Sequence, residues 1–429
     1  MSSLISPVRV ESTGGLPSWL RRIGGTVTGW PAFYRAQYAS NPRRVILLTL
    51  MVIGIFVYPI AYQAIPSSIT RALPIPSSTV VVFMLIFGIM AIGLNIVIGF
   101  AGLLDLGYVA FYALGAMVVG WWASDHFATV NGEKGIHVGV SDFAGSLPGI
   151  HLNFLILLVG AIFVCAIAGV IIGLPTLRLR GDYIAIVTLA FGEIIGRIFQ
   201  NGDEITIFGD NKLSNGRQSI SPIDAIDLPF IAPFDGALNL RPFYWTALAL
   251  VLVVLFVNIR LRDSRLGRAW IALREDEVAA ASMGVPLVKT KLFAYAAGGA
   301  FGGVSGAFLA AYFSSVNAIS FQFGFSIFIL AMVILGGLGS IWGVVLGAVA
   351  LAFVNNRLIP DVLDQGFVGN ALRDAGLNFS FTEISFGVFG FILVIMMVLR
   401  PEGILPERRR QMELTEGIGS DESVFESRL

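Results

Sequence analysis

Long apolar segments most constrain what this chain can fold into. Because about 20 mostly apolar residues cross the hydrocarbon core of a bilayer as a helix, a segment of that length is a candidate transmembrane span. The candidate segments are 45–64, 79–99, 104–123, 152–173, 183–200, 243–259, 290–313, 323–338, 340–356 and 383–399. The sequence therefore predicts an all-α fold, a polytopic transmembrane helical bundle of about ten spans.

The composition agrees with a membrane environment. Hydrophobic residues make up 56% of the 429 residues and charged residues only 13%, whereas soluble domains carry about 25% charged residues. The chain lacks the charge to cover a soluble surface, so membrane lipids are its expected surroundings. The formal net charge is zero, and nothing in its distribution predicts a nucleic-acid partner.

Two of these predictions leave an alternative open. The segments 323–338 and 340–356 are either two spans or one re-entrant element, because Gly336, Gly337 and Gly339 interrupt them. The segment 183–200 contains two charged residues, so it is expected to face other protein or water and not lipid.

Basic residues orient the bundle. With a cytoplasmic N-terminus, 20 of the 28 Lys and Arg residues fall in or beside the inside stretches, as the positive-inside rule requires. An even number of spans then places both termini in the cytoplasm. The predicted parts are a polar, basic cytoplasmic segment at 1–44 without a cleavable signal peptide, a transmembrane domain at 45–405, and a cytoplasmic tail at 406–429.

The sequence offers no constellation for catalysis. Cys165 is the one cysteine, so a disulfide within the chain and a thiolate metal cluster are excluded. The three histidines, His126, His137 and His151, fall in one polar stretch and are interpreted as loop histidines with no metal site. The phosphate-binding pattern G-x-x-x-x-G-K-[ST] does not occur. We therefore predict a protein that is not an enzyme, has no catalytic residue and binds no cofactor or metal itself.

A few polar residues lie in or beside the apolar segments, and such residues are the best pointers to a transport pathway. Glu193 and Arg197 are four residues apart on one helical face, so they either form a structural ion pair or line the pathway. Asn95, Asp105 and Thr188 either form hydrogen bonds between helices or contact a ligand. The candidate pathway-lining residues are Asn95, Asp105, Tyr183, Thr188, Glu193 and Arg197.

Glycines predict close helix packing. Gly298, Gly302 and Gly306 recur every four residues and share one face, with Gly299 and Gly303 beside them. In lipid, small residues let helix backbones approach each other closely. We expect this face to pack tightly against neighbouring helices, with direct contact to a transported solute as the alternative.

The cytoplasmic loop 260–289 is predicted to contain a short helix. Glu275, Asp276 and Glu277 are typical of a helix start, and Gly284 and Pro286 of a stop. The loop could be a solvated connector, but a compact amphipathic helix with both ends marked favours a docking surface for another protein.

Five blocks of sequence, spread over 79–405, resemble the LivM type of membrane subunit, which belongs to bacterial ATP-driven importers for branched-chain amino acids. The blocks lie at 93–116, 173–193, 267–284, 333–340 and 400–405. The resemblance implies a type II ABC importer fold in the bacterial plasma (inner) membrane. It also implies that 260–289 is the coupling loop to an ATPase, with the coupling residues Arg274, Glu275, Asp276, Glu277, Ala280 and Gly284.

The resemblance further implies a set of partners. These are a homologous second permease of the LivH type, two ABC ATPase subunits that use ATP and Mg, and a periplasmic or lipid-anchored amino-acid binding protein. The block 207–220 departs from the family pattern and keeps only Asn215-Gly216 and Ile220 of it. Urea, short amides and other amino acids therefore stay open as alternative substrates. A secondary transporter that works without ATP is the alternative mechanism.

Overall fold

The computed structural model describes residues 42–66, 75–129, 134–140, 147–177, 179, 182–207, 211–227, 234, 239–364, 385–399 and 403–405. Most of the predicted segment 1–44 and all of the predicted tail 406–429 lie outside these residues. Contacts divide the chain into two compact units, Met1–Gln63 and Ala64–Leu429.

The described part of the first unit is one apolar helix. It is α2 (Pro42–Ala64), which coincides with the predicted segment 45–64. The consecutive side chains of Met51, Val52 and Ile53 are all exposed. Consecutive helical residues point in different directions, so α2 is apolar around its circumference, as expected for a helix surrounded by lipid.

The second unit is a bundle of helices. Those in its first half are α4 (Ser78–Asn95), the π-helix η1 (Ile96–Phe100), α5 (Val109–Trp122), the 3-10 helix η2 (Asp125–Phe127), α6 (Phe154–Thr176), α7 (Asp182–Gln200) and α8 (Arg241–Asp263). They are followed by α9 (Arg265–Glu275), α10 (Glu277–Ser282), α11 (Leu287–Phe313), the 3-10 helix η4 (Ala318–Ser320), α12 (Phe323–Gly336), α13 (Ile341–Phe353), the π-helix η5 (Val354–Asp364) and α15 (Ser385–Leu399). Among the described residues, six helices are long and apolar enough to cross a membrane. The predicted polytopic helical bundle is confirmed.

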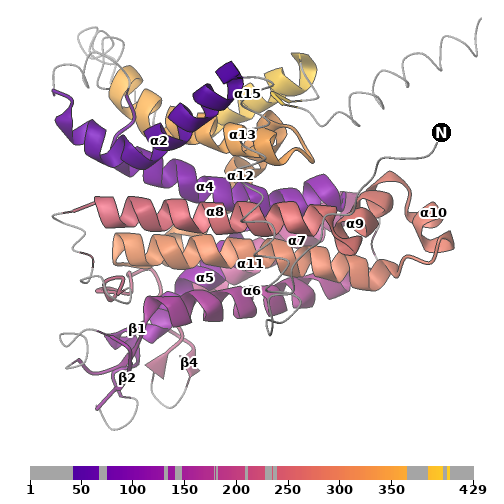
Figure 1. Ribbon diagram of the computed structural model, residues 1–429. Coiled ribbons are helices and arrows are strands. Elements are labelled where there is room, and N and C mark those ends of the chain that lie inside the picture. Colours follow the sequence, from indigo (N-terminus) through magenta and orange to yellow (C-terminus); the bar gives the residue numbers. More distant parts are fainter. Residues whose placement is uncertain are drawn as a thin grey trace, which may run out of the picture. The chain divides into compact units, whose positions relative to one another are not determined.

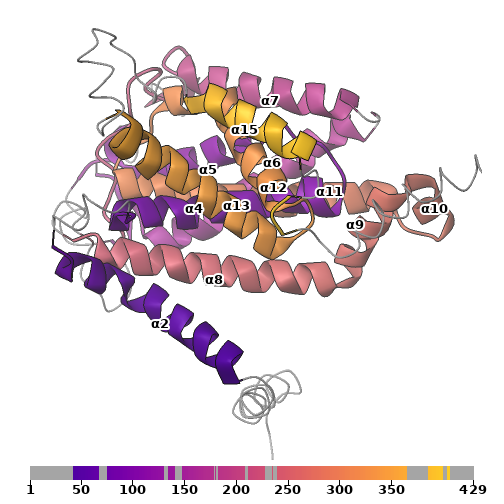
Figure 2. The same ribbon diagram turned by 90° about the horizontal axis from the view of Figure 1, so that it is seen from above.

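Helix α11 is the centre of this unit. It packs against α4, α5 and α6, and α12 and α13 pack against α4 (Figure 1). Figure 2 shows α7 and α8 on opposite sides of these central helices. One end of the unit carries α9 and α10, and we call it the α10 end. The opposite end carries the short strands, and we call it the sheet end.

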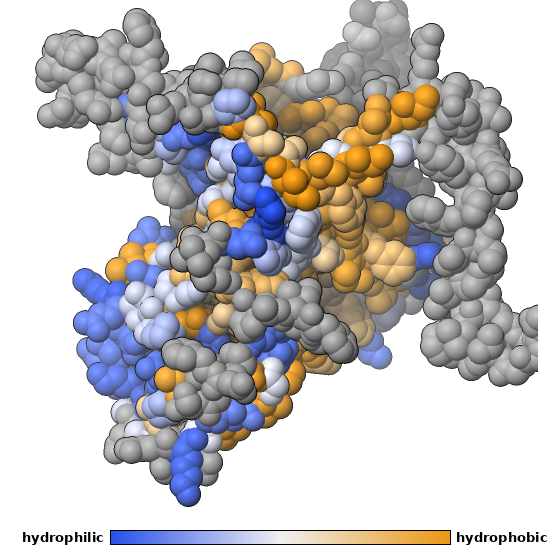
Figure 3. Space-filling view, turned by 60° about the vertical axis from the view of Figure 1, so that its left-hand side comes forward, coloured by the Kyte–Doolittle hydropathy of each residue, from blue (hydrophilic) through white to orange (hydrophobic). Residues whose placement is uncertain are grey.

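Five short strands lie at the sheet end. They are β1 (Ala123–Ser124), β2 (Ile136–Val138), β3 (Ile150–Leu152), β4 (Thr206–Ile207) and β5 (Asn211–Lys212) among the described residues. β3 lies between β1 and β2, antiparallel to β1 and parallel to β2. β4 pairs with β5 as a hairpin. Hydrophilic residues gather at this end, whereas hydrophobic residues cover the neighbouring helices (Figure 3).

The glycine face of α11 packs tightly, as predicted. A Cβ added at Gly298 would lie 2.5 Å from Val97 Cγ2, and one added at Gly303 would lie 2.7 Å from the sulfur of Cys165. These partners belong to the α4–η1 segment and to α6, on two sides of α11. Glycine therefore permits the backbone of α11 to be enclosed by its neighbours.

Two predictions need correction or refinement. The predicted segment 104–123 becomes helical only at Val109, because Gly102 has a φ of 71° and a left-handed residue cannot continue a helix. Asp105 therefore lies in the loop between η1 and α5 and not inside a helix. The segment 323–356 forms two separate helices, since Gly337 and Gly339 also take positive φ values in the turn between α12 and α13.

Candidate functional site

The predicted docking helix is one of two helices. Helix α9 begins at Ser264, whose hydroxyl accepts a hydrogen bond from the backbone N–H of Gly267 at 3.2 Å. The indole N–H of Trp270, which is fully buried, donates to the carbonyl of Thr290 at 2.9 Å. Helix α9 is thereby fixed to the start of α11. Helix α9 is not among the predicted helices, although Ser264 and the apolar residues Leu266, Trp270 and Leu273 are a helix signal.

Helix α10 is short and capped at both ends. The Asp276 carboxylate accepts hydrogen bonds from the N–H groups of Val278 and Ala279 at 2.8 and 3.0 Å. The chain leaves α10 through Gly284, with a φ of 83°, and Val285 N–H donates to the carbonyl of Ala280. This is the Schellman ending that glycine favours. The predicted stop is confirmed, whereas the predicted acidic start is divided between helices: Glu275 ends α9, Asp276 is the cap and Glu277 begins α10.

The outer face of α10 is apolar and exposed. Val278 is 72% exposed and Met283 86%, whereas Ala280 is buried on the inner face. The caps satisfy the backbone hydrogen bonds at both ends of this short helix. Val278 in the helix and Met283 at its C-cap therefore expose apolar side chains from an ordered backbone. A surface of this kind is typical of a protein contact.

Side chains of α9 and α10 are tied to the membrane helices. Arg274 Nη1 donates to the carbonyl of Gly99 in η1 at 2.5 Å. Lys291 Nζ of α11 donates to Glu277 Oε1 at 2.7 Å, and the Lys291 side chain is only 5% exposed. Arg274 therefore joins α9 to η1, and Glu277 joins α10 to α11, both through charge-assisted contacts.

Other blocks of the resemblance meet at the same end. The buried side chain of Asn95 accepts a hydrogen bond through Oδ1 from the N–H of Gly339, at 2.9 Å. The N–H of Ile404 donates to the carbonyl of Leu335 at 2.9 Å. The blocks at 93–116, 267–284 and 333–340 and the described residues 403–405, far apart in sequence, therefore contact one another at the α10 end.

Thr188 joins α7 to the loop before α5, in which Asp105 lies. Thr188 Oγ1 accepts from the N–H of Leu106 at 3.0 Å, and Asp105 Oδ1 accepts from the N–H of Gly107 at 2.9 Å. Both side chains are buried within this chain. The structure therefore gives Thr188 and Asn95 the hydrogen bonds between segments that the sequence allowed, and Asp105 a bond within its own loop.

Helix α7 has an exposed face that combines charge with apolar groups. Arg197 Nε lies 3.9 Å from Glu193 Oε2, so the predicted pair forms, and these side chains are 68% and 43% exposed. Tyr183, Ile186 and Ile194 are also exposed. Charged groups on a membrane helix are costly in contact with lipid, so this face requires protein or water beside it. The structure separates this pair from the buried candidates Asn95, Asp105 and Thr188.

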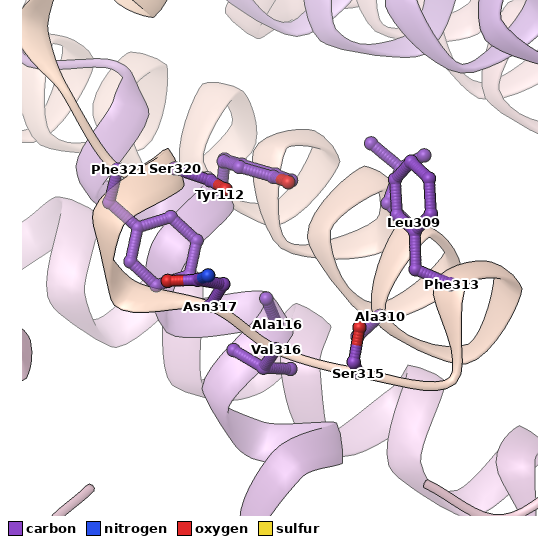
Figure 4. Close-up of a pocket in the computed structure, with 10 residues that line it drawn as sticks. All are labelled: Tyr112, Ala116, Leu309, Ala310, Phe313, Ser315, Val316, Asn317, Ser320 and Phe321. Carbon is purple, nitrogen blue, oxygen red and sulfur yellow. The ribbon is translucent and has the colours of Figure 1, made fainter. Parts of the chain in front are cut away.

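A pocket of about 220 Å³ opens among α5, α11 and the chain segment 315–321. That volume corresponds to several water molecules of about 30 Å³ each. Figure 4 shows the rings of Phe313 and Phe321 on opposite sides of the pocket, with Asn317 and Ser315 on the segment between them. Apolar walls with a few polar groups are typical of a small-molecule site. No local sequence pattern predicts this pocket, because its residues come from separate segments.

The histidines belong to the sheet end. His137 and His151 stack with ring centroids 5.3 Å apart, and His151 Nδ1 lies 2.8 Å from Asp224 Oδ2. Burial raises the pKa of Asp224, and burial lowers the pKa of His126. Among the described residues no group of three or more His, Cys, Asp or Glu is placed to hold a metal ion.

The divergent block at 207–220 is packed onto the helices at the sheet end in its described part. The indole N–H of Trp121 donates to the carbonyl of Leu213 at 2.7 Å, and Ser214 Oγ donates to the carbonyl of Phe199 at 2.5 Å. Ile220 forms a bridge with Val316, which lines the pocket. The block is therefore in direct contact with the segment 315–321, which lines the pocket.

Comparisons with known proteins agree with one another. The family described as branched-chain amino acid transport system, permease component, matches residues 76–399. The high-affinity branched-chain amino acid transport system permease protein LivM of Salmonella typhimurium is 35% identical over 395 residues, which cover 89% of this chain and 79% of the relative. LivM of Escherichia coli is 36% identical, with 79% and 72% of the two chains covered.

The permease protein LivH of Escherichia coli is also similar, at 28% identity over 155 residues, which cover 36% of this chain and 44% of LivH. No solved structure matches the chain significantly. The match of the family over most of the helical unit, together with the two LivM relatives, places this chain in the family of permease components of branched-chain amino acid transport systems.

Proposed function

We propose that this chain is the membrane-spanning permease subunit of an ATP-binding cassette importer for branched-chain amino acids. It would receive leucine, isoleucine or valine from a periplasmic or lipid-anchored binding protein and pass it into the cell. The names of the two LivM relatives support this substrate class. Urea and short amides are the competing substrates.

The observation that carries the proposal is the exposed apolar face of α10. Val278 and Met283 project from a helix that is capped at both ends. Glu277 ties this helix to α11, and Arg274 ties the adjacent α9 to η1. Such an element is suited to dock as a rigid body in a groove of a partner protein. Two ATPase subunits, which would bind ATP and Mg, are that partner in the proposal.

A second permease of the LivH type would complete the pathway. Similarity of this chain to LivH supports a pair of related subunits. The exposed Glu193–Arg197 pair on α7 supports a covered or water-filled face there, because lipid would leave both charges poorly solvated. We assign the exposed face of α7 to the translocation pathway between the two permeases.

The topology follows from the distribution of basic residues. The α10 end would face the cytoplasm, because the loop 260–289 is rich in arginine. The sheet end would face the binding protein. The ten predicted segments would all cross the plasma (inner) membrane in a type II arrangement, with both termini inside.

Substitution on the outer face of α10 tests the proposal. We expect Met283→Asp to abolish ATP-driven uptake of labelled leucine and to release the ATPases from the purified complex, because a charge replaces an apolar anchor. Folding should be unchanged, since Met283 is exposed. Leu266→Asp on α9 is the matched control and should retain uptake.

Two results would contradict the proposal. Uptake that persists in cells without any ATPase partner would indicate a secondary transporter. Uptake of urea with no uptake of leucine by the intact complex would reject the substrate class.

A further inference from the structure

A second cavity lies at the α10 end, and its lining is charged. Its volume is about 340 Å³, and it is lined by the segment 101–104, Leu179, Ile184 near the start of α7, residues of α9 and α10, and Lys291 near the start of α11. Every one of these segments contributes at least one side chain or backbone group to its wall. It is separate from the pocket at the sheet end, with which it shares no residue.

Three charged residues line the cavity. Arg274 and Lys291 are cationic and Glu277 is anionic, so the wall carries one excess positive charge. Lys291 is nearly buried and is paired with Glu277 at 2.7 Å. The stem of Arg274 packs against Gly102, where an added Cβ would lie 2.7 Å from its Cγ. These contacts hold both cations and the carboxylate in place around one space.

The rest of the wall is aliphatic. Leu104, Leu179 and Ile184 contribute to it, and Leu103 and Leu273 are buried beside them. A ligand that matches this lining has a carboxylate for the two cations, an ammonium group for Glu277 and an aliphatic side chain for the leucines. An α-amino acid with a branched aliphatic side chain has all three.

We propose that this cavity binds a free branched-chain amino acid from the cytoplasm and that the bound product slows the transporter. The substrate class rests on the proposed function above. A ligand here would contact Arg274 of α9, Glu277 of α10 and Lys291 of α11 together, which are the residues that connect α9 and α10 to the membrane helices. Binding that favours one arrangement of these elements shifts the conformational equilibrium of the cycle.

The test uses the whole transporter in liposomes that enclose ATP, with the binding protein and labelled leucine outside. Millimolar unlabelled leucine enclosed with the ATP should reduce the initial uptake rate by about fivefold or more, as is typical for coupled sites. Enclosed 4-methylpentanoate, which lacks the ammonium group, and 3-methylbutylamine, which lacks the carboxylate, should have little effect. Equal inhibition by 4-methylpentanoate would overturn the amino-acid assignment.

Variants that fill the cavity identify the site. Leu179→Phe and Leu104→Trp place bulk in the cavity from two sides and leave its charged residues unchanged. Each should retain uptake at low internal leucine and lose most of the inhibition. Leu174→Phe, on the exposed surface of α6 and outside the cavity, is the matched control and should remain inhibited.

The outcomes separate this inference from the proposed function. Uptake without inhibition by internal leucine in the unmodified transporter, or inhibition that both cavity variants retain, overturns the inference alone. If the transporter takes up no branched-chain amino acid, the proposed function fails. If a cavity variant does not assemble, labelled-leucine binding to the purified complex, measured with the other cavity variant, decides the location.

Discussion

At the scale of single residues, two buried asparagines differ in the hydrogen bonds that their side chains make. Asn95 bridges α4 to the turn before α13 through the N–H of Gly339. Asn258 of α8 is fully buried, and its side-chain oxygen and nitrogen have no hydrogen-bond partner among the described residues. The Nδ2 of Asn95 also has no partner among the described residues. Asn95 therefore satisfies one backbone donor, whereas Asn258 satisfies none and costs free energy.

The same substitution at both positions measures this difference. Asn95→Leu should lower the unfolding free energy by about 1–3 kcal/mol, because the N–H of Gly339 loses its acceptor. Asn258→Leu should be neutral or stabilising, because it removes a polar group without a partner in the described structure. The thermal unfolding midpoints of the purified permease complex check the prediction. Equal decreases for both variants would show that volume, and not hydrogen bonding, determines the effect.

At the scale of elements, close backbone contacts between helices determine the packing. Helices α5 and α11 meet at Gly115 and Gly303, where an added Cβ at Gly115 would lie 2.6 Å from the Cα of Gly303. By contrast, nothing lies within 4 Å of a Cβ added at Gly88 of α4. Gly115 is therefore required for close helix packing and Gly88 is not, although the sequence around both is apolar.

A matched pair of alanine substitutions tests this packing. Gly115→Ala should destabilise the protein by about 1–3 kcal/mol, because α5 must move away from α11. Gly88→Ala should leave stability unchanged or raise it by up to about 1 kcal/mol, because alanine favours the helix over glycine. Thermal unfolding and the yield of assembled complex report both effects. A loss of stability from Gly88→Ala would contradict this account.

At the scale of the whole molecule, the exposed surfaces of α6 and α7 differ in polarity. The exposed residues of α6, among them Phe163, Ile167 and Ile171, are apolar and recur every four residues. The exposed face of α7 carries the Glu193–Arg197 pair. We therefore expect lipid at α6 and a water-filled pathway at α7.

Cysteine labelling tests this difference. Ile194→Cys on α7 and Ile171→Cys on α6 are the same substitution at positions with similar exposure, 52% and 58%. A membrane-impermeant maleimide should label the α7 cysteine at least about tenfold faster, because only a hydrated thiol forms the reactive thiolate. The native Cys165 is buried and gives a low background. Comparable rates at the two positions would reject a pathway along α7.

The sequence by itself determined where the helices lie and where several of them end. Hydropathy is a local property, so every predicted apolar segment overlaps a helix of the structure. Helix ends marked by local chemistry, such as Gly284 after α10, were also predictable because the cap is made by neighbouring residues. The family resemblance used the same local blocks and led to the same family as the comparisons.

Only the tertiary structure decided how these segments meet. The contact from Arg274 to Gly99 joins residues 175 positions apart, and no local pattern predicts it. The position of Asp105 in a loop, the two cavities and the exposed side of α7 likewise depend on packing between helices. The physical reason is that a periodic apolar pattern specifies that a helix is surrounded by apolar groups, whereas it does not specify whether lipid or another helix provides them.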